Sequence, residues 1–296
     1  MHEGARPAPF LKWAGGKRQL LPRILDLAPR RIETYYEPFV GGGAVFFGLA
    51  AERRFARAVL ADANPELVNC YEQVRDDVDG VIAALSKHRN EAGAYYKVRD
   101  QAPADLSPTE RAARVIYLNR CGYNGLYRVN RAGRFNVPFG RYLRPRICDP
   151  HRLQAASRAL ADVEIICGDF LNVLAKRKLA TGDFVYLDPP YVPLSRTSSF
   201  TSYAQGAFGP DDQQRLADLL GTLSAERIPA VLSNSDCRET RRLYSVPDAG
   251  LKIQRVPVRR AINSVAHRRG PVAEILVRTL AIGPTAARRA AARPRV

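Results

Sequence analysis

Residues 35–43 read Tyr35-Tyr36-Glu37-Pro38-Phe39-Val40-Gly41-Gly42-Gly43, and the apolar run 44–51 follows them. A strand, a glycine-rich turn and a helix in this order form the nucleotide-binding opening of a doubly wound α/β fold. Glycine has no Cβ, so it lets the backbone approach a ligand closely. The spacing differs from the G-x-G-x-x-G pattern, which disfavours a dehydrogenase. A plain tight turn stays open as an alternative.

A second strand is expected at 58–61, and Asp62 follows it directly. In such folds a carboxylate about 20 residues after the glycines binds ribose hydroxyls. The alternative is that Asp62 or Asn64 caps a helix beginning at Pro65. The glycine turn and Asp62 together predict a nucleoside-type cofactor.

Two further expected strands, 163–167 and 184–187, also end close to carboxylates. The carboxyl ends of parallel strands face one crevice in an open α/β sheet, so Asp62, Asp169 and Asp188 are expected to share one site. We expect Asp169 to bind the amino group of a cofactor purine, with Phe170 covering its ring. Asp188 is then expected to face the substrate.

The turn Asp188-Pro189-Pro190-Tyr191 predicts the chemistry. Prolines lack N–H groups, so the turn offers carbonyl acceptors beside one carboxylate. The exocyclic amine of adenine is a weak nucleophile because its lone pair is delocalised into the ring. Asp188 and the carbonyl of Pro189 could each accept one N–H, while Tyr191 stacks on the base. A methyl group held on a sulfonium would then be transferred in line, to a base flipped out of the duplex.

The charge predicts a polyanionic partner. Lys and Arg number 46 against 29 Asp and Glu, for a net charge of +17. Removing the four arginines of the segment 285–296 leaves +13, so the end of the chain does not explain the excess. An arginine-rich coding bias is the alternative. Nucleic acid is the usual partner of a protein with this balance.

Between 67 and 152 the α/β alternation gives way to helices and to two runs of interleaved aromatic, amide and arginine residues, 119–130 and 133–142. Arginine pairs with guanine edges or phosphates, asparagine pairs with adenine, and aromatic rings stack on exposed bases. These runs predict a nucleic-acid-reading module, a β-hairpin on a helical base. The alternative is a hairpin whose rings pack on its own domain.

The remaining pattern completes the expected organisation. We predict a catalytic domain at 1–66 and 153–284, a DNA target-recognition domain at 67–152 and a disordered basic tail at 285–296. A Ser-, Thr- and aromatic-rich loop over the site is expected at 193–209. Further expected helices are 66–75, 78–88, 109–119 and 211–226, and further expected strands are 230–234, 251–256 and 272–280.

The five cysteines show no paired C-x-x-C spacing and the four histidines do not cluster with them, so no metal site and a reducing compartment are expected. No apolar run approaches the ~20 residues of a membrane span. We therefore expect a cytoplasmic protein associated with the nucleoid, with no membrane partner.

Several motifs together carry a family resemblance. They are FLKWAGGK (10–17), EPFVGGGAVF (37–46), LADANPEL (60–67), YNGLYRVN (123–130), FNVPFGRY (135–142), DPPY (188–191), PLSRTSSFTSY (193–203) and VLSNSD (231–236). With them the chain resembles the Dam type of adenine-specific DNA methyltransferases from Phe10 to about Leu276. In that family the cofactor motif precedes the recognition domain and the catalytic motif follows it. Cys121, where relatives often carry an aromatic ring, and the small Ala63 depart from the pattern.

The resemblance implies a Rossmann-like S-adenosylmethionine-dependent methyltransferase sheet with an inserted, mainly helical target-recognition domain that carries a β-hairpin. It implies S-adenosylmethionine as donor and N6 of an adenine in double-stranded DNA as acceptor, within GATC. The expected catalytic residues are Asp188, Pro189, Pro190 and Tyr191. The expected cofactor-binding residues are Trp13, Lys17, Phe39, Gly41, Gly43, Asp62, Asp169, Phe170 and Asp188. The expected DNA-binding residues are Lys12, Tyr123, Asn124, Leu126, Arg128, Pro138, Arg141 and Tyr142.

Two kinds of alternative stay open. Another amine could be the acceptor, but the resemblance links Asn at position 188 to glutamine and Ser to cytosine, so Asp188 favours adenine; RNA adenine is disfavoured by the inserted module. The second alternative is a catalytically silent DNA-binding regulator, against which the complete set of Asp62, Asp188, Pro189 and Tyr191 argues. The sequence leaves open a role in restriction–modification, with a companion nuclease, or in replication and repair. A monomer suffices for the chemistry.

Overall fold

The computed structural model describes residues 5–13, 15, 17, 19–192, 208–247, 249–259 and 271–281. The predictions for the loop 193–207 and for the tail 285–296 therefore lie outside the described residues. Among the residues that are described, no helix is long and apolar enough to cross a membrane.

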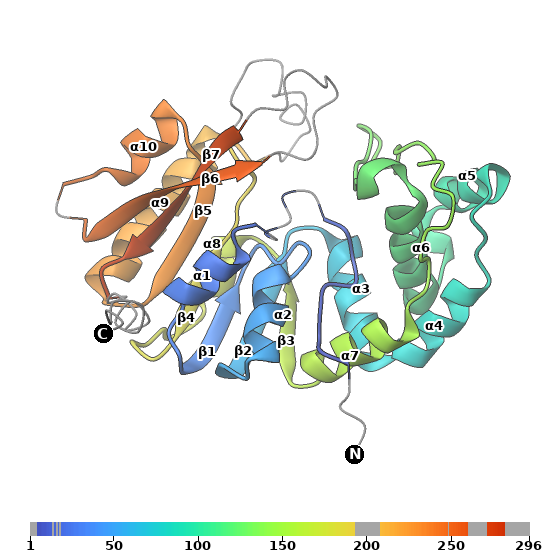
Figure 1. The fold of residues 1–296 in the computed structure, drawn as a ribbon, viewed down its shortest axis with the longest axis horizontal. Coiled ribbons are helices and arrows are strands. Elements are labelled where there is room, and N and C mark those ends of the chain that lie inside the picture. Colours follow the sequence, from blue (N-terminus) through green and yellow to red (C-terminus); the bar gives the residue numbers. More distant parts are fainter. Residues whose placement is uncertain are drawn as a thin grey trace, which may run out of the picture. The chain divides into compact units, whose positions relative to one another are not determined.

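The described residues form a mixed α/β fold, as predicted (Figure 1). Seven strands lie in the order β3-β2-β1-β4-β5-β7-β6. The pairs β1–β4, β2–β3 and β4–β5 are parallel, whereas β7 is antiparallel to β5 and β6. The strands are β1 Ile32–Glu37, β2 Phe55–Asp62, β3 Val163–Cys167, β4 Phe184–Leu187, β5 Ala230–Ser235, β6 Leu251–Arg259 and β7 Pro271–Thr279.

Ten α-helices and two short 3-10 turns accompany the described strands. The helices are α1 Leu21–Leu27, α2 Ala44–Ala51, α3 Pro65–Asp76, α4 Val78–Ser86, α5 Ala92–Asp100, α6 Pro108–Cys121, α7 Pro150–Leu160, α8 Phe170–Ala175, α9 Pro210–Ala225 and α10 Arg238–Tyr244. The 3-10 turns are η1 Pro103–Asp105 and η2 Tyr123–Gly125. The chain divides into two compact units, which we call the first unit (Met1–Arg18 and Glu37–Arg177) and the second unit (Gln19–Tyr36 and Lys178–Val296).

In the first unit, β2 and β3 run side by side in a register that ends with Asp62 opposite Cys167. Helix α6 forms the centre of the helical cluster, because it packs on α3, α4 and α5. A capping box at Ser107 and Glu110 fixes where α6 begins, since the side chain of each residue accepts a hydrogen bond from the backbone N–H of the other. The helical base expected beneath the hairpin is therefore present.

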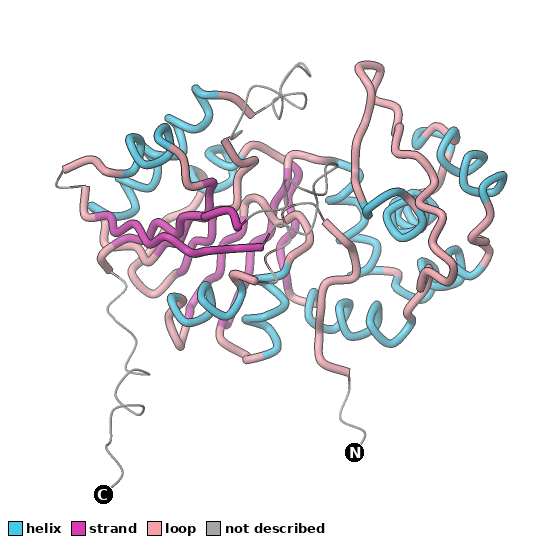
Figure 2. The backbone as a smooth tube through the Cα atoms, turned by 45° about the horizontal axis from the view of Figure 1, so that its top comes forward, coloured by secondary structure: helices cyan, strands magenta, loops and turns pink. Residues whose placement is uncertain are grey.

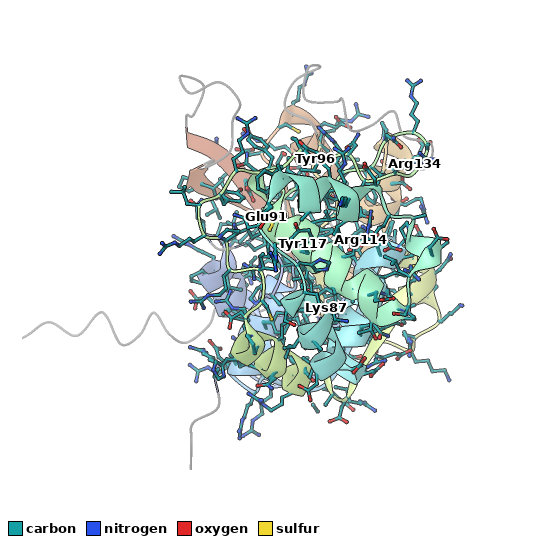
Figure 3. The ribbon with its side chains drawn as sticks, turned by 90° about the vertical axis from the view of Figure 1, so that its right-hand side faces the viewer. Lys87, Glu91, Tyr96, Arg114, Tyr117 and Arg134 are labelled. Atoms are coloured by element: carbon teal, nitrogen blue, oxygen red, sulfur yellow. The ribbon has the colours of Figure 1, made fainter. Side chains whose placement is uncertain are left out.

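Buried polar side chains fasten this helical cluster (Figure 3). The guanidinium of Arg114 donates to the carbonyls of Val98 (3.0 Å) and Arg99 (2.8 Å), at the end of α5 where helical carbonyls lack partners. The ring of Tyr117 stacks on His88 with centroids 4.4 Å apart, and its hydroxyl donates to the carbonyl of Arg89. Burial lowers the pKa of His88, so this stack holds a neutral imidazole more readily.

In the second unit, β4 is buried along its whole length. A continuous apolar strand is typical of a parallel sheet with both faces covered, which is why 184–187 shows no alternation. Tyr35 of β1 stacks on Phe184 of β4 with centroids 5.9 Å apart. Helix α9 packs on β5 and β7, and α10 packs on α9 and β6.

The predicted strands 163–167 and 184–187 agree with β3 and β4 at both ends, and the predicted helices agree with α3, α4, α6 and α9 within a few residues. Four helices were not predicted: α5, α7, α8 and α10. Helix α8 has six residues and α10 has seven, which is too short for a helical period to show. Helix α5 begins after Glu91 without a side-chain cap, so its start carries no sequence signal.

Candidate functional site

The carboxylate of Asp62 joins the glycine turn to the end of β2. Its Oδ2 accepts a hydrogen bond from the N–H of Gly41 at 3.2 Å, and its Oδ1 accepts from the N–H of Asn64 at 3.0 Å. Helix α3 is capped by Asn64, whose side chain accepts from the N–H groups of Glu66 and Leu67. The alternative in which Asp62 caps this helix is therefore wrong.

Two glycines of the turn are required by space and by backbone conformation. Gly41 and Gly43 have φ of +47° and +67°, a region that side chains disfavour. A Cβ on Gly41 would lie 2.9 Å from Cδ1 of Trp13, and one on Gly43 would lie 2.6 Å from the hydroxyl oxygen of Tyr71. Tyr71 donates to the carbonyl of Gly41 at 3.1 Å, so the turn is held from beneath.

Burial raises the pKa of Asp62, and the backbone N–H groups of Asn64, Gly41 and Ala63 oppose that rise. A carboxylate that has lost water is stabilised by any further hydroxyl or amino donor that approaches it. Asp62 is thus suited to bind a polyhydroxylated ligand at the end of β2.

Asp169 lies at the same end of this strand pair as Asp62, because the N–H of Gly168 donates to the carbonyl of Asp62 at 3.1 Å. Asp169 caps α8 by accepting from the N–H of Leu171 at 3.0 Å. The ring of Phe170 is buried and packs on Phe39, with centroids 5.2 Å apart. Of these two predicted cofactor residues, only Phe39 keeps accessible ring surface.

The segment before α1 places three predicted residues in the first unit. Trp13 is half-buried beside Gly41 and stacks on Tyr127, with centroids 5.5 Å apart. Lys17 is buried, and its Nζ donates to the carbonyl of Gly15 at 2.5 Å. The exposed Lys12 holds its Nζ 4.9 Å from the centre of the Tyr142 ring, a cation–π geometry.

The predicted hairpin is present, but it consists of isolated bridges and not of continuous strands (Figure 2). Antiparallel bridges pair Gly122 with Phe139 and Val129 with Phe135. At the tip, Oδ1 of Asn130 accepts from the N–H groups of two residues beyond it, 132 and 134, each at 3.0 Å. The hairpin therefore depends on side-chain contacts more than a regular β-ladder would.

The outward side of the hairpin carries most of the predicted DNA-binding side chains. Tyr123 is 50% exposed. Asn124, Arg128, Pro138 and Arg141 are exposed, and Leu126 and Tyr142 are half-buried. Other rings, such as the buried Phe135, pack inside the hairpin as the alternative reading of these aromatics proposed.

Arg128 has a partner within the hairpin. Its Nε donates to Oδ1 of Asn136 at 2.7 Å, and its Nη2 donates to the carbonyl of the same residue at 3.2 Å. Arg128 is nevertheless an exposed residue. A guanidinium fork oriented by one amide is pre-organised to donate in a fixed direction.

Asn119 of α6 was not predicted, yet it joins the segment before α1 to the hairpin. Its Oδ1 accepts from the N–H of Lys12 at 2.8 Å, and its Nδ2 donates to the carbonyls of Lys12 (2.5 Å) and Gly125 (2.8 Å). The side chain is buried. An asparagine inside a helical pattern shows nothing in the sequence that would indicate this role.

In the second unit, an ordered chain of hydroxyls reaches Asp188. Ser233 Oγ lies 2.9 Å from Oδ1 of Asp188 and 3.0 Å from the hydroxyl of Tyr186. A carboxylate only accepts, so Ser233 gives its single proton to Asp188 and accepts the proton of Tyr186. Ser233 belongs to the motif VLSNSD, which indicated the segment without indicating this contact.

The C-terminal side of the Pro-Pro turn is held by one amide pair, Gln213 and Asn234. Gln213 of α9 donates to the carbonyl of Pro190 at 2.9 Å and accepts from Nδ2 of Asn234 at 3.0 Å. Oδ1 of Asn234 accepts from the N–H of Val192 at 3.2 Å. Within the described part of the chain, no group donates to the carbonyl of Pro189, the predicted acceptor of a substrate N–H.

Tyr191, the last residue of the turn, donates its hydroxyl proton to Oε2 of Glu274 at 2.7 Å. Burial, followed by the negative charges of Asp188 and Glu274, raises the pKa of Tyr191 far above its ordinary value. The ring is therefore neutral and fixed in orientation. Gln213 and Glu274 lie outside every motif, and no sequence signal indicated them.

Asp62 and Asp169 belong to the first unit and Asp188 belongs to the second. Their sharing of one site stays a prediction from their positions at strand ends. All five cysteines are unpaired. In the part of the chain that the structure describes, no three His, Cys, Asp or Glu side chains form a group that could hold a metal ion.

Comparison with known proteins adds an independent finding. Residues 13–262 match the family described as D12 class N6 adenine-specific DNA methyltransferase. The chain is 41% identical to the type II methyltransferase M1.LlaDCHI of Lactococcus lactis subsp. cremoris, over 91% of this chain and 94% of that protein. It is 42% identical to the type II methyltransferase M.MjaIII of Methanocaldococcus jannaschii, over 88% and 94%.

A third relative carries a different name. The chain is 38% identical to the DNA adenine methylase of Escherichia coli K12, over 90% of this chain and 93% of that protein. Among solved structures, a precorrin 8w decarboxylase from Methanobacterium thermoautotrophicum aligns with a TM-score of 0.37 at 13% identity, over 88% of this chain and 89% of that one. That similarity is too low to support an argument.

We predict that Asn119→Ala frees the segment before α1 from the hairpin. The change leaves three backbone groups without partners, at Lys12 and Gly125, and each buried unpaired group costs about 1–3 kcal/mol. Trp13 follows Lys12 directly and is the single tryptophan of the chain. Its fluorescence emission should shift to the red and become more accessible to acrylamide.

The control for this change is Asn130→Ala at the exposed hairpin tip. It should leave the emission of Trp13 unchanged. Equal quenching of Trp13 in the unchanged protein and in Asn119→Ala would contradict the proposed link.

Proposed function

Because the chain belongs to the D12 class of N6 adenine-specific DNA methyltransferases, we propose that it transfers the methyl group of S-adenosylmethionine to N6 of an adenine within GATC in double-stranded DNA. Methyl transfer to DNA adenine follows from the family. The donor, the recognition sequence and the roles of single residues are the proposal.

The observation that carries the proposal is the construction of the Asp188–Tyr191 turn. Ser233 donates a hydrogen bond to one oxygen of Asp188, and Gln213 donates one to the carbonyl of Pro190. The carbonyl of Pro189 has no donor within the described residues. A carboxylate oxygen and an unpaired carbonyl beside an aromatic ring are what an exocyclic amine needs in order to donate both of its N–H groups in hydrogen bonds and present its lone pair.

The proposed mechanism requires no group beyond the donor and these residues. Asp188 and the carbonyl of Pro189 each accept one N–H of the adenine amine, which favours a pyramidal nitrogen. Tyr191 stacks on the base and is held in place through Glu274. S-adenosylmethionine would supply the methyl group and leave as neutral S-adenosylhomocysteine. The positive charge on N6 would be stabilised by the carboxylate of Asp188 until N6 gives up one proton, through Asp188, to solvent. Positioning and local electrostatics then supply most of the rate.

The first unit offers a fitting set of groups for S-adenosylmethionine. We propose that Asp62 accepts the ribose hydroxyls, since it is a buried carboxylate at the end of β2 that a donor would stabilise. Trp13, Phe39, Gly41 and Gly43 would surround the cofactor with apolar surface and closely approaching backbone. Lys17, Asp169 and Phe170 complete the proposed set, on the basis of their positions in the sequence.

The proposed DNA contacts lie on the hairpin and on Lys12. Exposed rings, amides and a pre-oriented guanidinium fit base stacking and edge recognition, and a net charge of +17 fits phosphate binding. Since N6 of a stacked adenine is out of reach of the turn, the base has to leave the helix. We propose that 67–152 is the target-recognition domain, and that GATC is read here because the hairpin carries YNGLYRVN and FNVPFGRY.

We predict that the purified protein places label from S-adenosylmethionine into unmethylated plasmid DNA, and that nucleases sensitive to GATC methylation then fail to cut it. Asp188→Ala should lower the rate by about 10²–10³-fold because it removes an acceptor aimed at the amine. The exposed Asp218→Ala is the control and should keep full activity.

Three outcomes separate the parts of this proposal. No incorporation of label would favour the silent DNA-binding alternative. Full activity of Asp188→Ala would refute the role of that residue. Label at sites other than GATC would overturn the recognition sequence alone.

We predict that Gln213→Ala lowers kcat by up to about 10²-fold while the KM for DNA changes little. The change removes the donor to the carbonyl of Pro190, so the turn loses its fixed geometry. Gln214→Ala removes an exposed neighbour whose side chain donates to Asp218, and it serves as the matched control. Equal kcat values for the two variants would show that the hydrogen bond from Gln213 does not position the turn.

We predict that Arg128→Ala weakens discrimination between GATC and altered sites by about 1–3 kcal/mol, while binding of the cofactor survives. Arg131→Ala, at the exposed tip of the same hairpin, is the control for loss of one positive charge. It should weaken binding to all sequences alike. The same ratio of cognate to altered-site rates in Arg128→Ala as in the unchanged protein would refute base reading by this residue.

A further inference from the structure

Tyr127 of the hairpin makes three contacts that no motif assigns to it. Its ring stacks on Trp13, with centroids 5.5 Å apart and planes 26° from parallel. It meets Phe135 of the opposite arm edge to face, with centroids 5.6 Å apart and planes at 67°. Burial, followed by the negative charge of Glu66, raises the pKa of Tyr127, and the neighbouring side chain of Asn64 lowers it.

Two of these partners, Trp13 and Asn64, lie next to the glycine turn and to Asp62 at the end of β2. Trp13 lies against the turn so closely that a Cβ on Gly41 would come within 2.9 Å of it. Asn64 donates its backbone N–H to Asp62 and caps α3 with its side chain. Tyr127 thus contacts the surroundings of Asp62 on two sides.

The third partner, Phe135, lies on the same hairpin as Arg128, the residue proposed to read a base. Phe135 is buried and is paired with Val129 by one of the two isolated bridges. The next residue, Asn136, holds the guanidinium of Arg128. Backbone hydrogen bonds between the arms flank Phe135, from the N–H of Asn136 to the carbonyl of Arg128 and from the N–H of Asn130 to the carbonyl of Arg134, and the ring of Tyr127 packs against its side chain.

We propose that Tyr127 couples occupation of the cofactor site to DNA recognition, through the stack Trp13–Tyr127–Phe135. The inference rests on the proposed function, because it takes Asp62 and Trp13 as the cofactor-binding side and Arg128 as the base-reading side. A ligand that orders Trp13 orders Tyr127 with it, and Tyr127 fixes Phe135 and the neighbouring arm. Tyr127 is a positioning residue, since it acts through Trp13 and Phe135.

Coupling between two sites is reciprocal, which gives the proposal a measurable form. If the cofactor orders the hairpin, then DNA tightens binding of the cofactor by the same factor. Factors of about 5–150-fold are typical of coupled sites. Trp13, as the single tryptophan, provides the signal for both measurements because it belongs to the stack.

The experiment measures binding of S-adenosylhomocysteine, which permits no turnover, from the emission of Trp13 with and without a duplex that holds one GATC site. Three variants are compared with the unchanged full-length chain. Tyr127→Leu removes the ring, and Tyr127→Phe keeps the ring but removes the hydroxyl. Tyr96→Leu removes an exposed ring on α5, elsewhere in the first unit, as a control.

We expect the duplex to tighten binding of S-adenosylhomocysteine by about 5–150-fold in the unchanged chain. Tyr127→Phe and Tyr96→Leu should retain that factor, whereas Tyr127→Leu should bring it close to one. The variant Tyr127→Leu should still bind S-adenosylhomocysteine in the absence of DNA, which shows that it is folded.

Other results overturn the inference. An unchanged factor in Tyr127→Leu, or a factor of one in the unchanged chain, would show that the stack carries no coupling. Equal loss in Tyr127→Phe and Tyr127→Leu would assign the effect to the hydroxyl and not to the ring. If the unchanged chain does not bind S-adenosylhomocysteine at all, the proposed cofactor is overturned together with this inference. That result differs from the others, in which the ligand binds but the coupling is absent.

Discussion

The hydrogen bonds of the Asp62 carboxylate are the interaction on which the first unit depends. One oxygen accepts from Gly41 in the glycine turn and the other from Asn64 at the start of α3. The carboxylate therefore keeps a strand end, a turn and a helix N-terminus in one arrangement. Trp13 packs on that turn and Tyr127 packs on Trp13, so the segment before α1 and the hairpin both take their positions from it. Because the carboxylate is buried, loss of any of these hydrogen-bond donors would lower the free energy of unfolding.

In the second unit, a different set of side chains holds the turn Asp188–Tyr191 in one arrangement. A Pro-Pro turn has no N–H groups of its own at those residues, so it cannot be stabilised from within. Side chains from other elements hold it instead: Gln213 binds the carbonyl at its end, and Asn234 binds the N–H that follows. Ser233 and Glu274 bind the side chains of Asp188 and Tyr191. Within the described residues, the carbonyl of Pro189 is the one in this Pro-Pro pair that receives no donor.

Patterns among neighbouring residues in the sequence predicted the strands β3 and β4 and the glycine turn. Apolar, β-branched runs predicted β3 and β4 to the residue, and the glycines of the turn were recognised from their position between a strand and a helix. The cap of α3 could not be chosen from the sequence, since Asp62 and Asn64 both suit that position. Their different roles follow from where Gly41 lies, 21 residues away in the chain. Short helices such as α8 were missed because six residues hold too few turns for a period.

By itself, the sequence determined the α/β class, the positions of the carboxylates at strand ends, the aromatic and basic character of the hairpin, and the turn whose composition suits an adenine amine. These are properties of residues close together in the chain, where spacing and composition are direct physical constraints. Only the tertiary structure decided which side chains support them: Asn119 beneath the hairpin, Gln213 and Glu274 behind the turn, and Tyr127 between Trp13 and Phe135. Such contacts join residues far apart in sequence, and an amide or a ring carries no mark of its partner until the chain has folded.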